Sequence, residues 1–134
     1  MERLYLGNDF DCFEKLHGWM IEEAFYDGDS IYLSLKGGHK VMLEPYGQCC
    51  ANCYVQHVDG ADFLKNGVVL DVETIDKGQE DLGSWEVVDS WGHRIRTDKG
   101  ICSIEMRVEH NGYYGGSLDV KSVEVCKGKI LEDF

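Results

Sequence analysis

Alternation of apolar and polar residues with a period of two is the feature that most constrains the fold of this chain. It is clearest at residues 31–35 and 101–108, where every second side chain is apolar and most of the residues between them are polar. Such alternation is typical of a strand with one buried face. The turn signals Gly37-Gly38 and Asn111-Gly112 favour tight hairpins. The sequence therefore predicts antiparallel strands joined by short turns.

Proline and polar residues set the expected limits of the strands. A strand that begins near Val41 is predicted to stop at Pro45, because proline cannot donate a hydrogen bond within a sheet. The polar stretch from Asp76 to Gly83 is predicted to be a mobile loop. The polar tail from Lys127 is predicted to fray. Six to eight strands are expected in the rest of the chain.

One helix is expected near the N-terminus, capped by Asn8 or Asp9 and ended by Gly18. Its apolar side chains follow at helical spacing, at Phe10, Phe13 and Leu16. The length of 134 residues suits one core, so a single domain is predicted over residues 1–134. The predicted fold class is α+β, mainly antiparallel β: a bent sheet or open barrel of six to eight strands with one N-terminal helix.

The charge balance excludes some classes of partner. The chain carries 13 basic and 25 acidic residues, a formal net charge of -12. Direct binding of nucleic acid is not expected, because it needs clustered Lys and Arg to neutralise phosphates. No apolar run approaches the ~20 residues of a membrane span, and the first residues do not resemble a signal peptide. A cytoplasmic location is predicted, with the six cysteines as thiols or metal ligands.

A cysteine-rich segment offers a partial set of metal ligands. It contains Cys49, Cys50 and Cys53, and His57 follows closely in the sequence. The C-x-x-C spacing of Cys50 and Cys53 is one that can chelate zinc. A structural zinc site normally needs four ligands, and the sequence offers no second pair with this spacing. A metal-binding structural protein that uses these four residues is one alternative.

The same segment offers a second alternative, an enzyme whose nucleophile is Cys49 or Cys50. Cys53 with His57 as its base is disfavoured. In an extended strand these two residues would share one face but lie roughly 13 Å apart, too far for proton transfer. Because the sequence contains no complete catalytic set, the protein is predicted not to be an enzyme.

Aromatic and polar residues in the second half of the chain suggest a ligand pocket. The pocket would stack a planar ligand such as a nucleotide base between aromatic side chains. The alternative is that the two adjacent tyrosines point to opposite faces of a strand, one into the core and one outward. The candidate ligand-binding residues are Trp91, His93, Arg107, Asn111, Tyr113 and Tyr114.

Two stretches carry a resemblance to a known family. One runs from Tyr46 to Gly60, with a glutamine before the paired cysteines, and the other runs from Ile104 to Leu118 through an Asn-Gly-Tyr-Tyr turn. They resemble an uncharacterised domain family that is frequent in bacteriophage and prophage genomes. That family typically has Gln-Asp-Cys-Cys-Glu entering a strand and Ser-Asn-Gly-Tyr-Tyr-Ser near the end. This chain lacks the first acidic residue and has alanine and histidine in place of the family's Glu and first Ser, at Ala51 and His110.

The resemblance implies a viral or prophage origin and expression in the cytoplasm of the host cell. It implies no mechanism. A small phage accessory protein without a catalytic set is expected to act by non-covalent binding of a host component. The expected role is to inhibit a host defence system by sequestering a protein or a nucleotide signal. The oligomeric state is left open.

Overall fold

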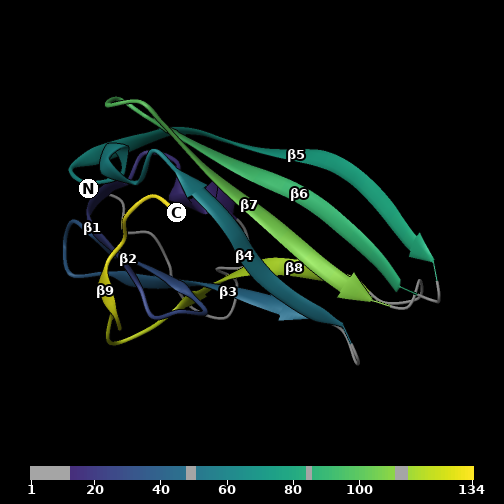
Figure 1. Ribbon diagram of the computed structural model, residues 1–134. Helices are drawn as coiled ribbons and strands as arrows, with labels where there is room; N and C mark the ends of the chain where they lie inside the picture. Colours follow the sequence, from purple (N-terminus) through teal and green to yellow (C-terminus); the bar gives the residue numbers. More distant parts are fainter. Residues whose placement is uncertain (1–12, 48–50, 84–85, 111–114) are drawn as a thin grey trace.

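The computed structural model describes residues 13–47, 51–83, 86–110 and 115–134 (Figure 1). Most of them are in strands, and the strand pairings within these ranges are antiparallel. Two short 3-10 helices accompany them, η1 (Phe13–Leu16) and η2 (Ala61–Phe63). The strands are β1 (Met20–Tyr26), β2 (Ile31–Leu35), β3 (Lys40–Gly47), β4 (Asn52–Asp59), β5 (Gly67–Gly83), β6 (Glu86–Thr97), β7 (Ile101–His110), β8 (Gly116–Ser122) and β9 (Lys129–Ile130).

The described strands form one open sheet that folds over into two layers. Its order is β4-β7-β6-β5-β1-β2-β3-β8, and β9 pairs with β1 beside this path. In Figure 1 the first four strands of this order, β4, β7, β6 and β5, make the upper layer. The last four, β1, β2, β3 and β8, make the lower layer. The layers are joined where β1 meets β5, by the pairs Met20↔Val68 and Ile21↔Gly67. This short junction lets the two halves of the sheet face each other.

The hydrophobic core fills the space between the layers. In β2, Ile31, Leu33 and Leu35 are fully buried, as the alternation predicts. In β7, every second residue from Cys102 to His110 is buried, and the residues between them face outward. Burial of one such aliphatic side chain contributes about 1.5–3 kcal/mol to folding. Below, the inner face of the sheet is the one toward the core, and the outer face is the one toward solvent.

The predicted α+β class is wrong, because the described residues contain 3-10 turns and no α-helix. Phe13 and Leu16 are both buried, as expected for the helix, but they belong to the four-residue turn η1. In a 3-10 helix residues i and i+3 lie on the same side, so this pair needs no longer helix. Gly18, at φ 85°, then redirects the chain into β1. Asn8, Asp9 and Phe10 lie outside the described residues.

The sheet has nine strands in the described ranges, more than the six to eight predicted. The additional strand is β9, which lies in the tail predicted to fray. The polar stretch predicted as a loop, residues 76–83, adds no strand but lengthens β5 to Gly83. Its partner is β6, through pairs such as Gln79↔Asp89 and Glu80↔Val88, with irregularities on both sides of them. Backbone pairing alone therefore extends this hairpin beyond the part that the alternation of apolar residues marks.

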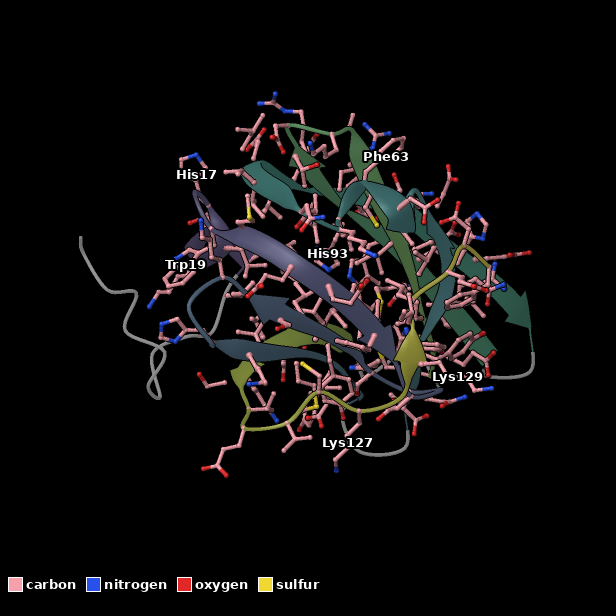
Figure 2. The ribbon with its side chains drawn as sticks, turned by 90° about the vertical axis from the view of Figure 1, so that its left-hand side faces the viewer. His17, Trp19, Phe63, His93, Lys127 and Lys129 are labelled. Carbon is pink, nitrogen blue, oxygen red and sulfur yellow. The ribbon has the colours of Figure 1, made fainter. Side chains whose placement is uncertain are left out.

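The C-terminal segment was predicted to fray, but it is hydrogen-bonded to the sheet. β9 pairs with the end of β1, and the Leu131 amide donates to the Ala24 carbonyl at 2.9 Å. Phe134 exchanges two backbone hydrogen bonds with Val58 of β4, at 2.9 and 3.0 Å. Figure 2 shows this segment from Lys127 past Lys129. The segment from Lys129 to Phe134 thus joins β1 to β4, and we call it the C-terminal strap.

The sequence predicts no membrane span, and the described ranges contain no long helix. The two helical segments found there have only three and four residues. Neither has the length or apolar character needed to cross a bilayer.

Candidate functional site

The two motifs behind the family resemblance are flanked by strands that meet at one end of the sheet. Gly47, before the cysteine run, pairs with Gly116, after the Asn-Gly turn. Asn52, after the cysteine run, pairs with Glu109, before that turn. We call this end, reached by these four residues and seen on the right in Figure 1, the loop end. Residues 48–50 and 111–114 themselves lie outside the described ranges.

A cluster of polar side chains lies beside the loop end, on the inner face of the sheet. His110, at the end of β7, is 9% exposed. Its Nε2 lies 2.7 Å from Oδ2 of Asp89 on β6. Gln79 of β5 donates from Nε2 to Oδ1 of the same carboxylate at 2.8 Å. An ionised carboxylate only accepts hydrogen bonds, so Nε2 of His110 carries the proton in this pair. We call these three residues the polar cluster.

A second polar group lies deeper on the same inner face. The ring of His93 is buried between the layers (Figure 2). It stacks on Phe13, with ring centroids 4.5 Å apart. Trp91 donates from its indole nitrogen to Nε2 of His93 at 3.0 Å, and Oγ1 of Thr74 lies 3.2 Å from Nδ1. Because indole is only a donor, Nε2 must accept, which places the proton of a neutral ring on Nδ1. Burial lowers the pKa of His93 from 6.5 to about 4.

The structure brings together only some of the predicted ligand-binding residues. Trp91 and His93 share the inner face and are hydrogen-bonded to each other. Arg107 lies on the outer face, where it pairs with Ser90 and Tyr54, so the sheet separates it from the other two. The remaining three candidates, Asn111, Tyr113 and Tyr114, lie outside the described residues.

The candidate metal ligands are divided by an irregularity in β4. The register shifts between Val55 and His57, and this bulge reverses which face each later residue points to. Cys53 therefore packs against the core, whereas His57 is on the exposed outer face. In a regular strand these two residues would share a face, but here they lie on opposite faces. Cys49 and Cys50 lie outside the described ranges, and within those ranges no three His, Cys, Asp or Glu side chains form a metal-binding group.

The thiols near the core are poor nucleophiles. Cys53 donates from Sγ to the Ser117 carbonyl at 3.6 Å, and burial raises the pKa of its thiol to about 11. Burial likewise raises the pKa of Cys102 to about 12. Because the thiolate is the reactive form, both side chains are protonated and unreactive at neutral pH.

We expect iodoacetamide at pH 7.5 to modify Cys53 and Cys102 at least about tenfold more slowly in the folded protein than in urea, because a thiol pKa of about 11 or 12 leaves little thiolate. Peptide mapping by mass spectrometry would measure each rate. Cys126, which is partly exposed, is the internal control and should react faster than Cys102. A folded-state rate for Cys53 equal to that of free cysteine would contradict this assignment.

None of the three members of the polar cluster, Gln79, Asp89 and His110, was among the site residues predicted from the sequence; His110 was noted only as a departure from the family motif. Asp89 shares the phase of Trp91 and His93, so the period of two does place its side chain on their face. The adjacent valines at 87 and 88 obscure that phase. Gln79 carries no comparable signal, because an irregularity in β5 sets its register with Asp89.

The polar cluster can recognise a polar ligand by hydrogen bonding. A histidine ring held by a carboxylate has a fixed orientation, as in sites where such a pair orients a base or a donor. The Asp89 side chain is 32% exposed, so the carboxylate is partly open to solvent while the imidazole is buried. The described residues thus provide an oriented set of donors and acceptors at the loop end.

Comparison with known proteins gives one match. The model of a family described as a domain of unknown function, DUF7448, matches residues 14–120. No curated protein and no solved structure matches the chain. The matched range includes all three residues of the polar cluster and most of the sheet.

Proposed function

Because the chain belongs to the DUF7448 family of domains of unknown function, we propose its function from the site itself: the protein acts by non-covalent binding at the loop end. The observation that carries this proposal is the polar cluster. His110 and Gln79 both hold the Asp89 carboxylate, at 2.7 and 2.8 Å, beside the strand ends that enter both sequence motifs. Groups held in this way before a ligand arrives lose little entropy on binding.

Binding is favoured over catalysis by the state of the nearest described thiol. Cys53 pairs with Val108 and so lies two positions from His110 along the neighbouring strand. Its side chain faces the core and its raised pKa keeps it protonated. A cysteine nucleophile needs a lowered pKa, so this thiol does not serve the histidine as a catalytic partner.

The partner that we propose is a component of a host cell. The resemblance of the two motifs to a bacteriophage and prophage family supports a viral or prophage origin and a site of action in the host cytoplasm. In this proposal the protein inhibits a defence system by sequestering a host protein or a nucleotide signal. The net charge of -12 suits a partner surface that is basic.

The test is native mass spectrometry of the protein recovered from infected host cells. We expect an additional mass on the wild type, and at least about tenfold less of it on Asp89→Asn, which removes the charge that orients His110 and Gln79. Lys99→Gln, in the exposed turn at the opposite end of the β6–β7 hairpin, is the matched control and should retain the bound species.

The fold of each variant is checked by its unfolding curve in urea. If Asp89→Asn is unfolded, Gln79→Ala replaces it, because the Gln79 side chain is exposed and its loss should be tolerated. A wild-type protein that carries no additional mass, or a folded cluster variant that retains all of it, would overturn the proposal.

A further inference from the structure

Gly92, in the middle of β6, is a glycine that the backbone does not require. Its φ angle is not in the left-handed region. A Cβ atom at this position would meet only ordinary contacts, 3.5 Å to Cε of Lys77 and 3.7 Å to the Ile104 carbonyl oxygen. Three other strand glycines without a positive φ differ in this respect. At Gly47, Gly67 and Gly116 a Cβ would come closer than 3.0 Å to a neighbouring atom.

A glycine inside a strand weakens it and often marks a place where a ligand approaches the backbone closely. Gly92 leaves such a place on the outer face of the layer formed by β4, β7, β6 and β5. A hollow of about 230 Å³ lies there, opposite to the face that carries the polar cluster. Its lining includes the outer-face polar residues His57, Asp59, Lys77, Arg94, Ser103 and Glu105.

Two cationic and two carboxylate side chains line the hollow. Lys77 and Glu105 neutralise each other across it, with Nζ 3.3 Å from Oε2. Arg94, Ser103 and Asp59 lie in one row across β6, β7 and β4. Arg94 makes no ion pair with another described residue. Two strand spacings, roughly 10 Å, separate its backbone from that of Asp59, so a cationic and an anionic side chain face the hollow from opposite sides.

The acidic side is reinforced by the C-terminal strap. The Asp133 side chain interacts with Asp59 and lies close to His57, while its Oδ1 accepts a hydrogen bond from the Ala61 amide at 2.7 Å. The Asp59 carboxylate therefore lines the β4 side of the hollow, with Asp133 behind it, and a guanidinium that can hold a carboxylate with two hydrogen bonds lies at the β6 side. A bound ammonium would be favoured at the first and a bound carboxylate at the second.

We propose that this hollow binds a small zwitterion of the free amino acid class, with its carboxylate on Arg94 and its ammonium toward Asp59. The volume of about 230 Å³ is below the ~300 Å³ lower end of pockets that hold drug-sized ligands, which fits a molecule of this size. The site is independent of the loop end, and its test does not depend on the function proposed above.

The test titrates the twenty common L-amino acids, each to 10 mM, into the ¹⁵N-labelled protein and follows backbone amide shifts. We expect at least one amino acid to shift the amides of Gly92 and Ser103 in a saturable way. The matched ligand controls are its N-acetyl derivative, which lacks the ammonium, and its amide, which lacks the carboxylate. Each should bind at least tenfold more weakly.

Two variants locate the site. Gly92→Val fills the hollow and should abolish binding, while its melting temperature is at least that of the wild type because valine suits a strand. Arg94→Gln should weaken binding at least tenfold. Lys99→Gln, in the exposed turn between β6 and β7, should bind the amino acid as the wild type does. The inference is overturned if none of the amino acids shifts these amides, if the N-acetyl derivative binds equally well, or if folded Gly92→Val still binds.

Discussion

Replacing Leu131 with alanine is expected to lower the free energy of unfolding by about 3 kcal/mol, within the range for large-to-small substitutions in a core. Leu131 is only 4% exposed and belongs to the core cluster, although it lies three residues before Phe134. The substitution leaves a cavity under the C-terminal strap, which is otherwise held by backbone bonds to Ala24 and Val58. Urea unfolding followed by tryptophan fluorescence would measure the loss.

The neighbouring residue provides the control for this prediction. Ile130 is 58% exposed, so Ile130→Ala removes a similar side chain from the same strap without opening a cavity. Its expected cost is below about 0.5 kcal/mol. Equal costs for the two substitutions would show that Leu131 does not pack as described.

Lowering the pH from about 6.5 to about 4 is expected to remove up to about 3 kcal/mol of stability through His93 alone. Burial lowers the pKa of this ring to about 4 in the folded protein, whereas its ordinary value is 6.5. Between these values the unfolded chain binds the proton and the folded chain does not, so stability falls as the pH falls. A difference of about 2.5 pKa units corresponds to roughly 3 kcal/mol.

His93→Gln isolates this contribution, because glutamine does not titrate and its amide oxygen can accept from Trp91. The variant is expected to be less stable than the wild type at pH 7, and the difference should shrink as the pH falls to 4. Urea unfolding at several pH values would measure both curves. A constant difference between the two proteins over this range would contradict a buried, neutral His93.

The strands that were predicted correctly turn every second side chain toward the core. Residues 31–35 and 101–108 show the period of two because the core imposes it on β2 and β7. The strand limit at Pro45 was wrong for a reason that the sequence does not contain. β8 pairs with β3 from Val41 to Gly47, whereas β2 pairs with β3 only as far as Leu43. The missing amide of Pro45 therefore disrupts no pairing with β2.

The candidate site was harder to predict because its geometry depends on irregular register. The bulge after Val55 puts Cys53 and His57 on opposite faces, and an extra residue of this kind leaves the alternation in the sequence ambiguous. Asp89 and His110 are far apart in the sequence and meet only through the pairing of β6 with β7. Tertiary pairing, which a single sequence does not reveal, thus assembles the polar cluster.

Joining of distant segments by the sheet has a consequence for how fast the protein folds. Val41 pairs with Ser122, and Phe25 pairs with Ile130, so the lower layer is completed only when both halves of the chain have met. A topology of such high contact order closes large loops before any contact compensates for the lost entropy. Folding is therefore expected on the millisecond-to-second scale, with the β6–β7 hairpin forming early and the outermost pairings forming last.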